Sequence, residues 1–353
     1  MSSQHPKLPQ RFFVSGYTKA TPTPQPQGIS TCTLEPQSGA MHVLHNQESA
    51  INPSYLARFE TQLFAVEENP ADEQPAVATF DVGPAGDLSF TGRTPVPGDA
   101  PCHLSLDSSG RLLPVACYNS GNVVLYSLEQ GDLVQQQAVQ HEDTRTQTRD
   151  PHAHQAVFGP DGKTLFVTDL GLDEIRSYRV RLGQLEPQQV TRFTAGSGPR
   201  HLAFHPSGDY AFVVGELDSS LTLLRHSSGI LEPLMTESLL PEPSGRSAAA
   251  AVRVAPSGRF VYASNRDLDR GGKDGIAIFR FDEAGKRLTR TAFVPSGGHL
   301  PRDFALTPDG QMLIVAHQGS HKLTSFWVDD ASGGLEPTGE TLELHQPVCV
   351  LMD

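Results

Sequence analysis

Two histidines lie two residues apart in the segment RDPHAHQAVFGPDGKTLFVTDLG, which covers residues 149–171. His152 and His154 would point to the same side of a β-strand, because side chains alternate along a strand. Together with Asp150 or Asp169 they could ligate a divalent metal ion. Either histidine could instead exchange a proton with a substrate near neutral pH. The surrounding sequence bears on which of these two interpretations holds.

The segment around His154 is one copy of a repeated pattern. Similar stretches begin at Arg200, Ala250 and Arg302, each with an alternating apolar segment, a Pro-Asp/Ser-Gly turn and a second apolar segment. This is the pattern of a β-hairpin. A fifth copy begins at Cys102, with serine in place of the turn proline. The turn glycines lie roughly 50 residues apart, a period typical of repeat folds; they are Gly110, Gly162, Gly208, Gly258 and Gly310.

Each hairpin is followed by more strand-like sequence, so one unit supplies about four short strands, the content of a propeller blade. A further unit with a degraded turn begins at Asn52. The C-terminal QPVCVLMD resembles only a first strand, and the N-terminal RFFVSGYT only a second strand. We therefore predict an all-β, seven-bladed β-propeller closed by pairing of the N- and C-terminal strands in one blade. A two-domain β-sandwich fits the period and the split ends less well. The prediction is one domain over residues 1–353, with a flexible tail at residues 1–10.

The composition excludes several classes of partner. The chain has 353 residues, with 27 Lys and Arg against 40 Asp and Glu, and its formal charge of −13 argues against binding nucleic acid. No segment approaches the roughly 20 apolar residues that span a bilayer, and the first residues lack a signal-peptide core, so no membrane association is expected. The four cysteines show no paired spacing. These features predict a cytoplasmic protein, and they do not indicate its oligomeric state.

Polar residues recur at equivalent positions of the repeat. In a propeller the first strand of each blade lines the central channel, so equivalent positions converge there. Eight residues before the turn glycine lie Cys102, His154, Arg200, Ala250 and Arg302. Eight residues after it lie Tyr118, Leu170, Glu216, Arg266 and Gln318, and the degraded copy places Glu68 opposite Glu216. Both sets should meet at one mouth of the channel, because the two ends of a hairpin lie away from its turn.

These residue types suit chemistry on an anion. Arginines bind phosphate or carboxylate and can stabilise an oxyanion, while a histidine or glutamate among them can move a proton. We predict His154, Glu216, Arg200 and Arg266 as catalytic residues and His152, Arg302, Glu68 and Gln318 as substrate-binding residues. Nearby arginines would repel a cation, so we expect no metal and no other cofactor. His201 should face away from the channel and pack in the core, and His205, beside a blade turn, should be structural.

Three motifs resemble one family over nearly the whole chain, from about Phe12 onward. They are PHAHQAVFGPDGKTLFVTDLGLDEI, GPRHLAFHPSGDYAFVVGEL and VYASNR. The chain resembles the seven-bladed propeller lactonases, which include bacterial 6-phosphogluconolactonases and fungal 3-carboxy-cis,cis-muconate lactonizing enzymes. In the lactonizing members a histidine, two arginines and a glutamate form the site. By motif the resemblance implies His154 or His152, Arg200, Glu216 and Arg266 for these roles.

The resemblance implies hydrolysis of a small anionic sugar lactone, with 6-phosphogluconolactone converted to 6-phosphogluconate. Arg200, Arg266 and Arg302 would hold the phosphate and the carbonyl. Glu216 or His154 would deprotonate the attacking water, and His154 would protonate the alkoxide. The sequence departs from the family pattern at Gly215, where asparagine is usual, which bears on the substrate more than on the fold. The alternatives are a muconate cycloisomerase and a non-enzymatic propeller that binds a protein partner.

Overall fold

The computed structural model describes residues 8–19, 27–242 and 245–353. Residues 1–7 of the predicted tail lie outside the described residues, and the first strand begins at Gln10. Apart from one short 3-10 helix, η1 (Ala71–Glu73), the regular structure in the described ranges is β-strand. No helix in this part of the chain is long and apolar enough to cross a membrane.

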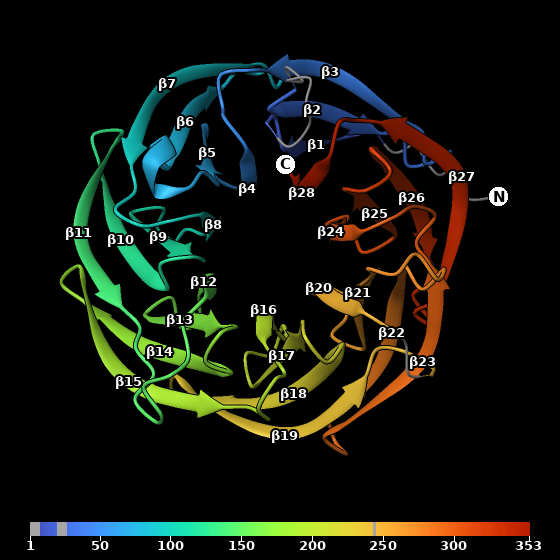
Figure 1. Ribbon diagram of the computed structural model, residues 1–353. Helices are drawn as coiled ribbons and strands as arrows, with labels where there is room; N and C mark the ends of the chain where they lie inside the picture. The colour runs from blue at the N-terminus through green and yellow to red at the C-terminus, as the bar shows by residue number, and fades with distance from the viewer. Residues whose placement is uncertain (1–7, 20–26, 243–244) are drawn as a thin grey trace.

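The strands form seven four-stranded antiparallel sheets arranged around a central channel (Figure 1). The innermost strands are β4 (Pro53–Phe59), β8 (Pro101–Leu104), β12 (Ala153–Phe158), β16 (Pro199–Phe204), β20 (Ser247–Val254), β24 (Pro301–Leu306) and β28 (Pro347–Met352). The second strands are β5 (Gln62–Glu67), β9 (Leu112–Cys117), β13 (Thr164–Asp169), β17 (Tyr210–Gly215), β21 (Phe260–Asp267), β25 (Met312–His317) and β1 (Gln10–Gly16). The third strands are β6 (Ala76–Val82), β10 (Asn122–Glu129), β14 (Glu174–Arg181), β18 (Ser220–Ser227), β22 (Gly275–Asp282), β26 (Lys322–Val328) and β2 (Ile29–Leu34). The outermost are β7 (Leu88–Pro95), β11 (Asp132–Gln140), β15 (Gln184–Arg192), β19 (Ile230–Ser238), β23 (Arg287–Pro295), β27 (Leu335–Glu343) and β3 (Met41–Gln47).

The two ends of the chain share one blade. Strand β28 pairs with β1 in antiparallel register, with Val14 opposite Val350. Figure 1 shows the red β28 beside the blue β1. The terminal residue Asp353 adds ion pairs to Arg11 of β1 and Arg58 of β4. The predicted seven-bladed propeller, closed by its N- and C-terminal strands, is confirmed.

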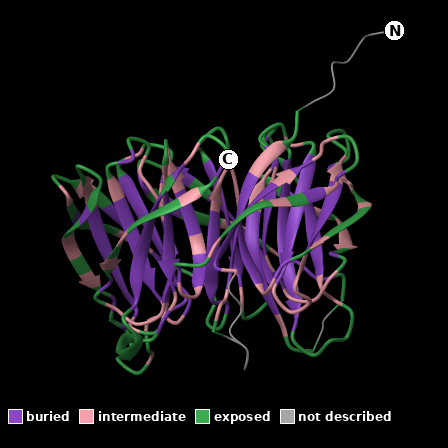
Figure 2. Ribbon diagram, turned by 90° about the horizontal axis from the view of Figure 1, so that it is seen from above, coloured by how far each residue is buried: buried purple, intermediate pink, exposed green. Residues whose placement is uncertain are grey.

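The sheets pack face to face through their apolar side chains. One core cluster joins Phe212 of β17 to Phe279 of β22 in the next blade, and both side chains are fully buried. Another joins Phe13 of β1 to Phe80 of β6. Buried residues therefore fill the height of the blades, while exposed residues lie mainly on the loops and outer strands (Figure 2). Each blade is stabilised mainly by its two neighbours.

The predicted blade turns are present between the first and second strands. The turn glycine Gly110 has a φ of 68°, the left-handed region that glycine adopts at low cost. A Cβ atom added there would lie 2.2 Å from the ring of Phe59 in the neighbouring blade. This glycine is therefore required by both its backbone conformation and its close contact.

Candidate active site

A β-bulge in each innermost strand directs side chains into the channel. In β12, Ala153 pairs with Asp169 and Gln155 with Thr168, so His154 is the inserted residue. Strand β8 inserts Cys102 and β24 inserts Arg302 at the equivalent position. An inserted residue bends the strand and redirects its side chain. The positions eight residues before the turn glycines thus share a defined backbone feature.

The inserted residues and the ends of the second strands enclose a cavity of about 210 Å³ at one mouth of the channel. Its lining brings together six predicted site residues and two others: Glu68, Cys102, Tyr118, His154, Arg200, Glu216, Arg266 and Arg302. Two predicted site residues, His152 and Gln318, do not line it. Gln318 lies in the turn after β25, where its backbone N–H donates to the carbonyl of Leu300.

Glu216 holds two arginines on one side of the cavity. Its two carboxylate oxygens contact Arg200 Nε at 2.8 Å and Arg266 Nη2 at 2.9 Å. Arg200 also donates from Nη1 to the carbonyl of Ala250 at 2.6 Å, and Arg266 donates from Nη2 to the carbonyl of Ala249 at 3.1 Å. Both guanidinium groups are therefore fixed in orientation by a carboxylate and by the backbone of β20.

The electrostatics of this group follow from burial and close charges. Burial and the neighbouring Arg266 lower the pKa of Arg200 to about 10, so its guanidinium stays charged at neutral pH. Burial opposes ionisation of Glu216, but Arg266 and Arg200 outweigh it and lower the pKa of its carboxyl. Glu216 is therefore an anion clamped by two cations.

A second charged group lies on another part of the lining. Arg302 Nη2 is 3.7 Å from Glu68 Oε2, and the hydroxyl of Tyr17 donates to the same oxygen at 2.8 Å. The Arg302 guanidinium also stands 5.6 Å from the centre of the Tyr17 ring. Although burial disfavours its charge, Tyr17 and Glu68 raise the pKa of Arg302. The cavity thus holds three arginines and two glutamates.

His154 is a neutral imidazole in these surroundings. Burial, and then Arg200 and Arg302, lower the pKa of His154 well below its usual value of 6.5. Its Nδ1 atom is buried and has no hydrogen-bond partner among the described residues. Because the side chain lines the cavity, Nε2 is the nitrogen available to a ligand.

The prediction that His201 faces away from the channel is wrong. Pro199 pairs with Gly215 and Leu202 with Val213, so the bulge in β16 contains both Arg200 and His201 and breaks the alternation of side chains. The His201 ring lies 5.3 Å from that of His154 and 5.7 Å from that of His103, each on another blade. His201 therefore packs inside the channel.

His205 lies at a blade turn, as predicted. Its Nδ1 pairs with the hydroxyl of Ser207 at 2.8 Å, and its Nε2 pairs with the carbonyl of Gly258 in the next blade at 3.2 Å. These contacts are structural.

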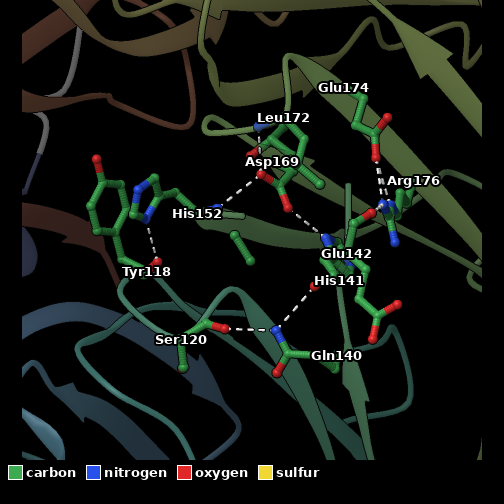
Figure 3. A network of polar contacts seen from close by, with 12 residues as sticks. Tyr118, Ser120, Gln140, His141, Glu142, His152, Asp169, Leu172, Glu174 and Arg176 are labelled. Carbon is green, nitrogen blue, oxygen red and sulfur yellow. Dashed lines mark hydrogen bonds and ion pairs between the residues drawn. The ribbon is translucent and has the colours of Figure 1, made fainter. Parts of the chain in front are cut away.

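His152 supports the wall of the cavity from behind. Its ring stacks on Tyr118 with centroids 4.5 Å apart, and its Nδ1–H donates to the Tyr118 carbonyl at 2.8 Å (Figure 3). The His152 backbone N–H donates to Asp169, whose other oxygen pairs with the buried His141 at 2.7 Å. His141 in turn contacts the Tyr178 hydroxyl at 3.0 Å. This network fixes the segment that leads into β12.

The metal interpretation of the two histidines finds no support in this arrangement. The carboxylate of Asp169 is engaged by His141 and by the backbone N–H groups of His152 and Leu172. The part of the chain that the structure describes contains no group of three or more potential metal ligands among histidine, cysteine, aspartate and glutamate.

Sequence reasoning left out three residues that contribute to the cavity. Cys102 and Tyr118 occupied equivalent repeat positions but carried no assigned role, and both line the cavity. Tyr17 directly follows β1, as Glu68 directly follows β5. Aligning the end of the N-terminal second strand with the ends of the other second strands would have placed Tyr17 at the channel mouth.

The fold and the cavity define a class of protein: a closed seven-bladed propeller with an arginine-lined pocket at one channel mouth. A family model described as "Lactonase, 7-bladed beta-propeller" matches residues 11–352. The chain belongs to this lactonase family.

Several relatives match over almost their full length. The 6-phosphogluconolactonase of Bacillus subtilis (strain 168) is 29% identical over 348 residues, which cover 96% of this chain and 97% of that protein. A protein of Lactococcus lactis subsp. cremoris (strain MG1363) is 31% identical, covering 98% of this chain and 99% of its own length. Among solved structures, the periplasmic gluconolactonase of Pseudomonas aeruginosa superposes with a TM-score of 0.89 at 28% identity, covering 98% of this chain and 99% of that one.

Proposed function

We propose that this protein hydrolyses a sugar lactone, and that its substrate is 6-phosphogluconolactone, which it converts to 6-phosphogluconate. The observation that carries the proposal is the cavity in which Arg200, Arg266 and Arg302 surround the neutral His154. The names of the Bacillus subtilis and Pseudomonas aeruginosa relatives support a lactone as the substrate class. These names do not favour a muconate cycloisomerase or a non-enzymatic propeller.

The arginines bind the anionic parts of the substrate and the transition state. A lactone carbonyl gains negative charge when water adds to it, and fixed guanidinium groups stabilise that charge without reorganising. Arg200 and Arg266 are fixed by Glu216 and by backbone carbonyls, so they suit the carbonyl. Arg302, 3.7 Å from Glu68, adds a third cation to the cavity for an anionic substrate.

His154 and Glu216 have different roles in this scheme. Both oxygens of Glu216 are engaged by arginines, so Glu216 is a positioning residue. Nε2 of His154 faces the reacting atoms and forms a hydrogen bond to the ring oxygen as the ester bond breaks. A neutral imidazole is suited to this task beside three cations.

The test is a hydrolysis assay with freshly prepared 6-phosphogluconolactone, with the spontaneous rate subtracted. Wild type should accelerate hydrolysis, and Arg200→Ala and His154→Ala should each lower kcat/KM by about 100-fold or more. Equal activity of both variants and wild type would refute the site. Inactivity on this lactone with turnover of the unphosphorylated gluconolactone would refute the phosphosugar assignment and keep the reaction class.

A further inference from the structure

The cavity contains a carboxylate that the scheme above uses only as a support. Glu68 follows β5 directly, lines the cavity, and has 20% of its side chain exposed. Its Oε2 accepts the hydrogen bond from Tyr17. Among the described residues, no hydrogen-bond partner contacts Oε1, and this atom is not buried. One oxygen of Glu68 is therefore open to the cavity.

The other titratable groups of the lining are poor proton acceptors. Both oxygens of Glu216 are already bound by Arg200 and Arg266. Protonation of His154 would add a cation next to Arg200 and Arg302, which the surrounding charges oppose. Cys102 and Tyr118 would accept a proton only as anions, and burial keeps both groups protonated by raising their pKa.

We propose that Glu68 is the catalytic residue that takes the proton from the attacking water, and that Tyr17 is its positioning residue. This inference rests on the proposed lactone hydrolysis. The groups that face Glu68 are Tyr17, Arg302 and Cys102. Tyr17 donates to one oxygen and so directs the other toward the cavity. A carboxylate near Arg302 becomes neutral when it takes a proton, so the step creates no extra cation in the site.

The step balances over two stages. Water gives one proton to the Glu68 carboxylate while its oxygen forms a bond to the lactone carbonyl carbon. The bond between that carbon and the ring oxygen then breaks, and its electron pair stays on the ring oxygen. Protonated Glu68 returns its proton to this alkoxide, with His154 stabilising it through a hydrogen bond. The product acid releases its proton to solvent, and Glu68 is again a carboxylate.

The position of Tyr17 links this role to the closure of the ring. Tyr17 follows β1 in the blade that the two chain ends share, while Glu68 and Arg302 come from the blades on either side. The contacts of Arg302 with Tyr17 and with Glu68 therefore form only when the propeller is closed. The shared blade thus contributes to the site as well as to stability.

The first experiment compares Glu68→Gln with wild type on 6-phosphogluconolactone. We expect kcat to fall by about 100-fold or more, the loss typical of a removed general base, while KM changes by a few-fold at most. The matched control is Glu73→Gln, on the same loop, where the side chain is 49% exposed and pairs with Lys19. Glu73→Gln should match wild type.

A second set of variants separates proton transfer from support of the fold. Glu68→Ala should regain activity when formate is added, because a small carboxylate can occupy the vacated position, whereas Glu216→Ala should not. Tyr17→Phe should lower kcat several-fold with KM nearly unchanged, because the Glu68 carboxylate loses the hydrogen bond that directs its other oxygen toward the cavity.

The outcomes distinguish the two proposals. Normal kcat with raised KM in Glu68→Gln would show that Glu68 only binds substrate and would overturn its catalytic role. Failure of formate to restore Glu68→Ala, with an unchanged kcat in Tyr17→Phe, would do the same. Wild type inactive on every lactone would overturn the proposed function, and the role of Glu68 with it.

Discussion

At the scale of single residues, the site depends on side chains with fixed partners. Arg200 shows this most clearly, because Nε contacts Glu216 and Nη1 donates to the carbonyl of Ala250. The planar guanidinium satisfies both partners and still presents a charge to the cavity. A lysine ammonium is a point charge on a flexible chain and cannot hold the same geometry.

Arg200→Lys should therefore lower kcat/KM on 6-phosphogluconolactone by about 100-fold, although the charge is kept. The measurement is steady-state kinetics of the variant and wild type. Arg225→Lys is the control, since Arg225 pairs with Glu232 on an exposed surface. An Arg200→Lys variant with wild-type kinetics would show that only the charge matters at this position.

The buried histidines make stability depend on pH. Burial, then Arg253 and Arg200, lower the pKa of His103 from 6.5 to about 3. Between these values the unfolded chain binds a proton that the folded chain does not, so the free energy of unfolding falls as the pH falls. The slope is up to about 1.4 kcal/mol per pH unit for each such histidine.

Urea unfolding between pH 7 and pH 4 tests this dependence. Wild type should lose stability steadily below about pH 6.5, where the unfolded imidazoles take up protons. His103→Gln should flatten this slope, while the same substitution at the exposed His42 is the control. Equal slopes in wild type and His103→Gln would contradict the assignment of His103 as a buried neutral group.

At the scale of elements, the repeated hairpin carries both the turn and the bulge. The bulged position lies a fixed number of residues before the turn glycine. The bulge directs the side chain at this position, such as that of His154 or Arg302, into the channel. The position is shared by all copies, but the residue placed there varies. The same element therefore supplies an arginine to the cavity in some blades, whereas at Ala250 it supplies a backbone carbonyl that accepts from Arg200.

The blade turns differ in how tightly they pack. Gly162 and Gly110 both have positive φ values, but a Cβ atom at Gly162 meets only Ser108 Oγ at 3.1 Å, whereas at Gly110 it meets the Phe59 ring. Gly162→Ala should cost about 1–2 kcal/mol from backbone strain alone. Gly110→Ala should cost about 1–3 kcal/mol more from overpacking. Chemical denaturation of both variants measures the difference, and equal losses would contradict it.

At the scale of the whole molecule, closure of the ring protects the sheet edges. Strand β28 covers the edge of β1, and its residues Cys349 and Val350 belong to the apolar clusters on either side of the shared blade. An uncovered inner strand would expose unpaired backbone groups. The last seven residues therefore carry far more stability than their number suggests.

Removal of residues 347–353 should abolish cooperative thermal unfolding and cause aggregation. Calorimetry and size-exclusion chromatography of the truncated chain test this. Asp353→Asn is the control, because it weakens only the ion pairs to Arg11 and Arg58 and should cost about 1 kcal/mol or less. A truncated chain that melts cooperatively near the wild-type temperature would show that the shared blade is dispensable.

Much of this architecture could be predicted because it is periodic. The turn glycines and alternating apolar segments indicated the blades, and counting from Gly162 and Gly208 placed His154 and Arg200 at one channel mouth. The direction of the His201 side chain was predicted wrongly. The prediction assumed that side chains alternate along the strand, and the bulge at Arg200 and His201 breaks that alternation. Gln318 shares the count but lies in a turn outside the cavity lining.

The sequence alone determined the seven blades, their closure, and the convergence of residues such as His154 and Arg200 at one channel mouth, because local hydrophobic periodicity and turn residues specify them. Only the tertiary structure decided the pairing of these residues. The ion pair of Arg266 with Glu216 and the contact of Tyr17 with Glu68 join different blades. Such contacts depend on side-chain direction and on distances across the channel, which positions along one strand do not encode.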